Sequence, residues 1–179
     1  MIKNFREKGY GYERKLARVF GLWWCKNDKA LWRNTVSGAR NSTLGELWGG
    51  DLIPALDEAT PWPLSVEIKK AEDWSVEGFI KGNPSEPLLQ YMIQTVRAAH
   101  LGRNQRALLV CAKNYAKPLA FLHHHSFQGI GSGLDYAVAR LRNFDVEVTD
   151  CMWDYPVIDF HVMHLDDFFL HYSRKDFQP

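Results

Sequence analysis

Two carboxylates and a lysine are the residues most suited to do chemistry together. Asp51 follows a Gly-Gly pair and opens a short apolar segment, and Glu67 lies two residues before Lys69 in the alternating segment 64–70. Side chains alternate between the two faces of a strand, so Glu67 and Lys69 share one face. If the two segments pair as a hairpin-like unit, Asp51 and Glu67 lie side by side with a lysine adjacent.

Paired carboxylates of this kind fit a divalent cation, which removes the repulsion between their charges. Mg²⁺ prefers one or two carboxylates, keeps several waters and shares phosphate oxygens; the backbone carbonyl of Ile68 would add a further ligand. Bound Mg²⁺, or Mn²⁺ in its place, activates water and stabilises charge on a phosphoryl group, while Lys69 would orient the water or the phosphate. These groups meet the requirements of phosphodiester hydrolysis. The alternative is an exposed strand face with Asp51 as a turn cap.

The elements that would position these residues alternate between helix and strand. Apolar residues at helical spacing predict a helix from about Gly11 to Leu22, and residues 30–36 and 51–55 predict short strands before strand 64–70. A loop at 72–84 leads to an amphipathic helix at 87–101 and a buried strand at 107–112. This α-β-β-β-α-β order predicts a mixed sheet with helices packed on it.

The remaining residues, 114–179, predict a less regular α/β extension. Strands are expected at 118–124, 146–149 and 157–163, and helices at 134–143 and 165–172. We expect one domain over residues 1–179, with a core at about 1–113 and the extension at about 114–179. The apolar segments of the extension would form a dimer interface or cover one sheet face within the monomer.

Composition and charge narrow the class of protein. The 179 residues are 46% hydrophobic and 24% charged, as in globular proteins, and no apolar run is long enough to span a bilayer. Charges near the N-terminus argue against a signal peptide, and three cysteines without metal-ligand spacing indicate a reduced, cytosolic protein. A membrane or exported protein is therefore not expected.

The formal net charge of +1 hides an asymmetry. Residues 1–42 hold ten lysines and arginines against three acids, whereas residues 145–179 hold eight acids against two bases. A basic segment of this kind attracts a polyanion such as DNA, although its charges would also suit a solvated helix face paired with the acidic tail. In or near this basic third lie four tryptophans, Trp23, Trp24, Trp32 and Trp48. They would stack on bases or fill the core, and Trp48, beside the Gly-Gly pair, is the candidate for substrate contact.

The motifs resemble those of the PD-(D/E)xK nuclease superfamily, whose core has the order α-β-β-β-α-β. Gly50-Asp51 and Val66-Glu67-Ile68-Lys69 carry the resemblance, with Gly50 where that superfamily usually has proline. More narrowly, residues 11–16 (GYERKL) and 33–38 (RNTVSG) resemble archaeal-type Holliday-junction resolvases. The resemblance covers residues 1 to about 113 and implies a restriction-endonuclease-like α/β fold.

Carried over position by position, the resemblance implies roles for further residues. Glu13, Asp51 and Glu67 would surround the metal, Lys69 would be the catalytic lysine, and Ser37 would lie on a loop that reaches the scissile phosphate. Gln90 matches a glutamine found near such sites, or is a solvent-facing helix residue. For Glu13 the alternative is a surface salt bridge with Arg14 or Lys15. The candidates for contact with DNA are Lys3, Arg6, Lys8, Arg14, Arg33, Arg40 and Trp48.

We therefore expect a Mg²⁺-dependent endodeoxyribonuclease of branched or duplex DNA, in the cytoplasm of a prokaryotic or phage-infected host cell. The narrower expectation is a homodimeric, structure-selective Holliday-junction resolvase of DNA recombination and repair, since a two-fold junction needs two paired cuts. The alternatives are a restriction- or repair-type nuclease on linear DNA and a non-catalytic DNA-binding module. A zinc site at His123-His124-His125 is a weaker alternative, because only His123 and His125 would face the same side of a strand.

Overall fold

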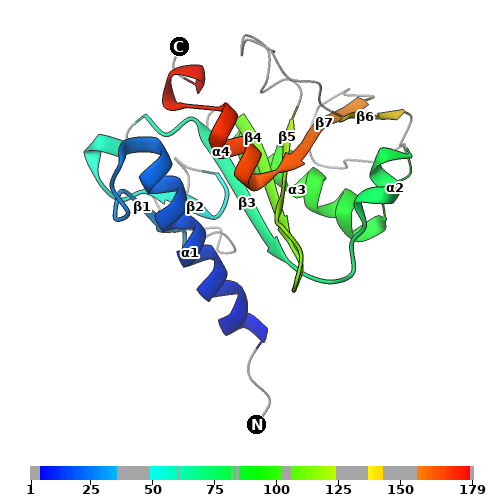
Figure 1. Cartoon of the computed structure of the whole chain (residues 1–179), viewed down its shortest axis with the longest axis horizontal. Coiled ribbons are helices and arrows are strands. Elements are labelled where there is room, and N and C mark those ends of the chain that lie inside the picture. Colours follow the sequence, from blue (N-terminus) through cyan, green and yellow to red (C-terminus); the bar gives the residue numbers. More distant parts are fainter. Residues whose placement is uncertain are drawn as a thin grey trace.

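The computed structural model describes most of the chain and shows an α/β arrangement (Figure 1). The described residues are 5–35, 49–59, 61–81, 83, 85–101, 106–123, 137–142 and 157–177. A long helix, α1 (Phe5–Cys25), comes first and is followed by the short strands β1 (Leu31–Arg33) and β2 (Leu52–Pro54). Among these residues no helix combines the length and the apolar character that crossing a bilayer requires.

A mixed sheet forms the centre of the fold, as the sequence predicts. Its strands lie in the order β3-β4-β5-β7-β6, with β3 and β4 parallel and the other neighbours antiparallel. Their bounds are β3 (Leu64–Lys70), β4 (Arg106–Ala112), β5 (Leu119–His123), β6 (Ala137–Arg142) and β7 (Val157–His164). Strands from the C-terminal third therefore continue the sheet that β3 and β4 begin.

Helices cover both faces of this sheet (Figure 1). On one face α1 and α4 (Leu165–His171) pack on a core that includes Phe20, Trp62 and Phe168. On the other face α2 (Val76–Ile80) and α3 (Glu86–Leu101) pack on a second core that includes Phe79 and Phe121. In β4 the side chains alternate between the two cores, as the period of two in a strand requires. Burial on both faces explains the continuous apolar run of this strand.

The C-terminal segment is used within the monomer. β7 pairs with β5 over five residue positions, and α4 places Phe168 against Phe20 and Trp23 of α1. Trp23 Nε1 also donates to the carbonyl of Tyr172 at 2.7 Å. Of the two uses that the sequence leaves open for the tail, these contacts support the intramolecular one.

Several elements differ from the sequence prediction. The helix α1 begins at Phe5 rather than near Gly11, and it includes Trp23 and Trp24. The expected loop at 72–84 contains α2, whose first turn is capped by the Ser75 hydroxyl, which accepts from the Glu77 N–H. Residues 137–142, within an expected helix, form β6, because pairing with β7 overrides the local helical pattern. The expected strand at 146–149 lies outside the described residues.

The hairpin expected between the Asp51 and Glu67 segments is also wrong. β2 pairs antiparallel with β1, and Gly50, just before β2, bridges to Val66 of β3 in parallel orientation. A hairpin needs antiparallel strands joined by a short turn. Here the intervening chain contains the short 3₁₀ helix η1 (Asp57–Ala59) and the buried Trp62, which pack against α1. Asp51 thus reaches β3 from a neighbouring strand pair rather than across a turn.

Candidate active site

The pair Gly49-Gly50 brings Asp51 against the edge of β3. A Cβ on Gly49 would lie 1.9 Å from the Ala98 carbonyl oxygen, and a Cβ on Gly50 would lie 2.5 Å from the Val66 carbonyl oxygen. Gly50 also has a φ of +82°, a conformation that L side chains rarely adopt and that the proline ring excludes. The backbone therefore explains why glycine stands where the resembling nucleases usually carry proline.

Asp51 continues the hydrogen bonding of β3 with its side chain. Its N–H donates to the Val66 carbonyl at 2.6 Å, and its Oδ2 accepts from the Ile68 N–H at 2.8 Å. The Ile68 N–H, the next donor along this edge of β3, therefore bonds to the Asp51 carboxylate instead of to a backbone carbonyl. This pair of bonds fixes Asp51 next to Glu67, the residue between Val66 and Ile68. Ile68 takes part through its N–H; the predicted role of its carbonyl as a metal ligand stays a prediction.

Glu67 and Lys69 share the face of β3 that α3 covers, as the alternation predicts. Lys69 Nζ donates to Glu67 Oε1 at 2.6 Å, and Gln94 Nε2 of α3 donates to the same oxygen at 2.6 Å. Lys69 Nζ also lies 5.4 Å from the centre of the Tyr91 ring. Glu67 is only 4% exposed and Asp51 only 7%, so both carboxylates are removed from water.

The electrostatics of the two carboxylates oppose their ionisation. Burial, with the nearby charge of Glu67, raises the pKa of Asp51 to about 7, although the Ile68 N–H and Lys69 act against this rise. Burial likewise raises the pKa of Glu67 against the lowering effect of Lys69. A cation bound between the two carboxylates would stabilise their charged forms and so offset the effect of burial on both pKa values.

Glu13 lies near this pair but is held by an arginine. Its Oε2 accepts from Arg33 Nε, and its charge raises the pKa of both Asp51 and Glu67. The guanidinium of Arg33 stacks over the Tyr10 ring at 3.7 Å from its centre. Glu13 therefore does form an ion pair, with a strand residue rather than with its helix neighbours Arg14 or Lys15. Its role in holding metal stays a prediction.

The donor set fits a small, hydrated cation. Within the described part of the chain no group of three or more His, Cys, Asp or Glu side chains is arranged to hold a metal ion. Mg²⁺ needs only one or two protein carboxylates, because waters and phosphate oxygens complete its shell. Asp51 and Glu67 supply those two carboxylates. Of the other two predicted ligands, the Ile68 carbonyl stays a prediction, and Glu13 accepts from Arg33 in the structure.

Some of the other predicted site residues lie in the described part of the chain and some lie outside it. Gln90 is exposed on α3 and does not join the site; Gln94, one turn later, holds Glu67 instead. Gln90 and Gln94 stand one helical turn apart, so spacing in the sequence alone does not distinguish them. Arg14 is exposed on α1 and lines a pocket together with Arg33. Arg6 and Lys8 lie in the first turns of α1, and Lys3, Ser37, Arg40 and Trp48 lie outside the described residues.

The histidine cluster is described only in part. The ring of His123 lies edge-on to Phe160, with centroids 5.2 Å apart, while His124 and His125 lie outside the described residues. Nothing in this packing favours a zinc ligand over an ordinary strand residue.

The α/β fold has a mixed sheet, and the buried Asp51 lies beside Glu67 and Lys69 of β3. This fold and this set of residues are those of a nuclease of the PD-(D/E)xK type. The chain belongs to the family described as "Phage putative PDDEXK endonuclease", whose model matches residues 4–178. The match spans the β5-β7-β6 part of the sheet as well as the N-terminal half. No curated protein and no solved structure matches the chain significantly.

Proposed function

We propose that the protein is a Mg²⁺-dependent endonuclease that hydrolyses DNA phosphodiesters at Asp51, Glu67 and Lys69. The observation that carries the proposal is the fixed position of Asp51, whose Oδ2 accepts from Ile68 N–H beside the buried Glu67. Membership of an endonuclease family supports DNA as the substrate. Mn²⁺ would substitute for Mg²⁺, because both favour carboxylate, carbonyl and water oxygens.

Each residue has a defined part in this reaction. Asp51 and Glu67 would hold the cation, which when bound would supply an activated water and neutralise charge on the phosphate. Gln94 and Lys69 hold Glu67 Oε1 in place, so the carboxylate keeps its orientation. The Lys69 ammonium has further N–H groups, which would donate to the attacking water or to a phosphate oxygen. Glu13 completes the acidic site when it leaves Arg33.

For the substrate we propose branched DNA, and for the assembly a homodimer that cuts a Holliday junction in recombination or repair. The support is the resemblance of residues 11–16 and 33–38 to junction resolvases. Glu13 of the first segment and Arg33 of the second form an ion pair in the structure. Two-fold junction symmetry would match the symmetry of a dimer. The cytoplasm of a phage-infected cell is the compartment we propose.

Cleavage of a synthetic four-way junction and of a linear duplex with the same arm sequence tests this function, first with Mg²⁺ and then with EDTA. We expect Mg²⁺-dependent cutting, with the junction preferred. Equal cutting of both substrates would overturn junction selectivity and favour a nuclease of linear DNA. Tight binding with no cutting of either substrate would favour a non-catalytic DNA-binding module. Light scattering of the protein with and without the junction tests the homodimer.

A further inference from the structure

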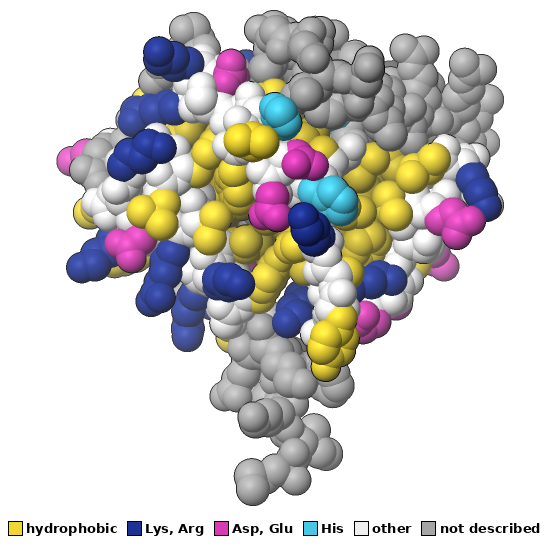
Figure 2. Space-filling view, in the orientation of Figure 1, with side chains coloured by type: hydrophobic (Ala, Val, Ile, Leu, Met, Phe, Trp, Pro, Cys, Tyr) yellow, Lys and Arg dark blue, Asp and Glu magenta, His cyan; other side chains and the backbone are white. Residues whose placement is uncertain are grey.

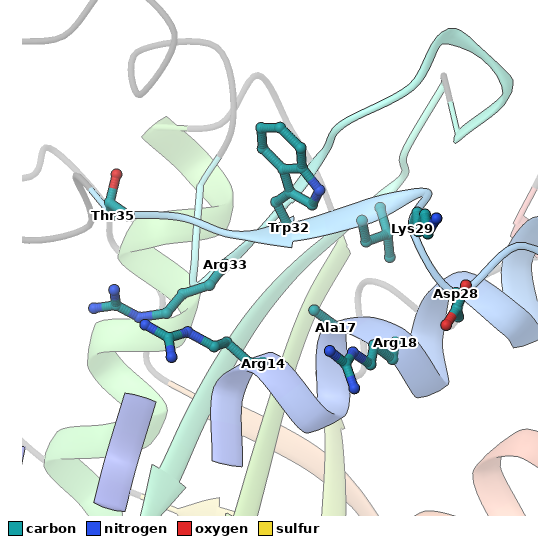
Figure 3. A pocket seen from close by; sticks show the side chains of 9 residues that line it. Arg14, Ala17, Arg18, Asp28, Lys29, Trp32, Arg33 and Thr35 are labelled. Atoms are coloured by element: carbon teal, nitrogen blue, oxygen red, sulfur yellow. The ribbon is translucent and has the colours of Figure 1, made fainter. Parts of the chain in front are cut away.

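A pocket of about 350 Å³ lies between α1 and β1 (Figure 3). Four cationic residues line it: Arg14 and Arg18 from α1, Arg33 from β1, and Lys29 from the turn between them. Asp28 is the single acidic residue in its lining. Lys and Arg side chains gather on the side of the molecule where α1 and β1 lie (Figure 2). The pocket is therefore a concave part of a broader basic surface.

The charges of the pocket favour an anion. Arg14 and Arg18 are exposed and stand four residues apart on α1, a spacing at which like charges repel. Arg33 is balanced by Glu13, but Arg14 extends beside Arg33 in Figure 3, so the two guanidinium groups share one side of the pocket. A phosphate bound here would relieve this repulsion and accept several N–H donors.

The turn that carries Lys29 has a fixed shape. Lys26 has a φ of 60° and ends α1, with its N–H donating to the Leu22 carbonyl. Gly21 gives the turn room, because a Cβ there would lie 2.5 Å from the Asn27 carbonyl oxygen. The Lys29 N–H donates to the Asn27 side chain at 3.0 Å. The pocket is thus closed at this end by an ordered turn.

Trp32 adds an aromatic surface at the pocket's rim. Its side chain is 63% exposed, and in Figure 3 its ring stands on the side of β1 away from α1. An indole left open to water loses the apolar burial that most tryptophans gain in a fold. Its face is free to stack on a nucleobase, a contact available to any base.

The strand β1 connects this pocket to the catalytic residues. Arg33 contacts Glu13, the Asn34 N–H donates to the Asp51 carbonyl at 2.7 Å, and Asn34 Nδ2 donates to the Gly50 carbonyl at 3.0 Å. Trp32 and Asn34 are two residues apart, which corresponds to about 7 Å along a strand. A nucleotide bound at Trp32 would therefore lie close to the phosphate that is cut.

We infer that this pocket binds a nucleotide of an unpaired DNA strand next to the scissile phosphate. Arg14, Arg18 and Lys29 hold a backbone phosphate, and Trp32 stacks on an unstacked base. The inference rests on the proposed function and names its substrate class as DNA with a single-stranded or splayed segment. Paired bases in intact duplex are already stacked on each other, so duplex would gain the phosphate contacts but not the stacking.

The test measures binding in EDTA of a fluorescein-labelled oligothymidylate and of a blunt duplex of equal length. We expect Trp32→Ala to weaken oligothymidylate binding at least about fivefold and to leave duplex binding unchanged. Trp32→Phe should retain most of the binding, because a ring remains. Arg18→Ala should weaken the binding of both ligands. It should also lower the slope of log affinity against log salt concentration by about one, as expected for one lost phosphate contact. The matched controls are the exposed Tyr115→Ala for the aromatic change and the exposed Lys81→Ala for the charge change.

The possible results test the inference about the pocket and the proposed function separately. Oligothymidylate binding that is unaffected by Trp32→Ala, or that falls equally in Tyr115→Ala, would overturn the inference. A wild-type protein that cuts linear duplex but binds oligothymidylate no better than duplex would overturn the inference and leave the nuclease intact. Binding that depends on Trp32, without Mg²⁺-dependent cutting of any DNA, would overturn the proposed function alone. If Trp32→Ala does not fold, as judged by thermal unfolding, unchanged salt dependence in Arg18→Ala overturns the inference.

Discussion

Gln94 of α3 reaches across to β3 and donates to Glu67 Oε1 at 2.6 Å, the same oxygen that accepts from Lys69 Nζ. Two donors on one buried carboxylate oxygen restrict how the carboxylate can turn. Groups that orient a metal ligand in this way commonly matter almost as much as the ligand. If Glu67 holds the cation as proposed, Gln94 would be its positioning residue.

We predict that Gln94→Ala lowers the rate of Mg²⁺-dependent DNA cleavage about 10- to 100-fold. Gln94→Glu would place a second carboxylate beside Glu67 and should also be impaired, because like charges repel. Initial rates at saturating DNA, measured over a series of Mg²⁺ concentrations, check the prediction; a higher Mg²⁺ requirement indicates loss of positioning. The matched control is Gln90→Ala, which changes the same side chain one turn earlier on the exposed face of α3. Equal effects of the two changes would contradict the role of Gln94.

The sequence does not indicate which of Gln90 and Gln94 contacts Glu67. The alternation of β3 was sufficient to place Glu67 and Lys69 on one face, and the Gly-Gly pair marked Asp51. Residues one helical turn apart are chemically equivalent in a sequence, and only the packing of α3 on β3 decides which one faces Glu67. The pairing of Arg33 with Glu13 is likewise invisible in sequence, because it joins elements that are distant in the chain.

The local sequence pattern also predicts the wrong secondary structure for residues 137–142, because it does not include contacts with distant strands. Residues 137–142 form a strand because β7 offers them a partner, and β7 itself depends on β5. Strand pairing of this kind is set by tertiary context more than by propensity. The mixed sheet was predictable from the order of elements; its strand order was not.

Asp51 and Glu67 should be indispensable for cleavage and dispensable for binding. Asp51→Asn and Glu67→Gln keep the shape of each side chain but remove the charge that holds a cation, so we expect cleavage to fall below detection. Binding of DNA should persist in EDTA, because basic residues outside the pair supply the phosphate contacts. Cleavage assays and fluorescence anisotropy on the same preparations check both halves. Normal cutting by either variant would remove the central assignment.

Burial of Asp51 should make the stability of the metal-free protein depend on pH. The pKa of Asp51 rises from 3.8 to about 7 on folding, so between these values the folded state binds more protons than the unfolded state. Stability therefore falls as pH rises through this window, by up to about 4 kcal/mol. Thermal unfolding in EDTA from pH 4 to pH 8 measures the slope, and Asp51→Asn should reduce it, while the buried Glu67, whose pKa is also raised, supplies the remaining slope. A slope that is the same in both proteins would contradict the raised pKa.

The same titration predicts how metal affinity depends on pH. The cation binds the ionised carboxylates, so Mg²⁺ and the proton compete for Asp51. We expect Mg²⁺ affinity to increase as pH rises from 6 to 8, and Mg²⁺ to raise the unfolding temperature more at pH 8 than at pH 6. Isothermal titration calorimetry and thermal unfolding with and without Mg²⁺ check this. A Mg²⁺ affinity that is constant over this range would show that Asp51 is ionised throughout.

Gly50 should tolerate no side chain. In Gly50→Ala the Cβ would lie 2.5–2.9 Å from backbone atoms of Val66, and the φ of +82° alone costs about 1–3 kcal/mol for a residue with a side chain. Gly50→Pro removes the conformation altogether, because the ring fixes φ near −65°. Both changes should therefore lower the unfolding temperature, displace Asp51 from Ile68 and abolish cleavage.

Gly11→Ala is the matched control for this change. Gly11 lies within α1, and a Cβ there would have no neighbour within 4 Å, so we expect a gain of about 0.5–1 kcal/mol in stability. Thermal unfolding of the three variants beside the wild type measures both effects. If Gly50→Pro unfolded at the wild-type temperature and still cut DNA, the backbone explanation for glycine at this position would be wrong, and proline would be compatible with the site as it is in the nucleases that the chain resembles.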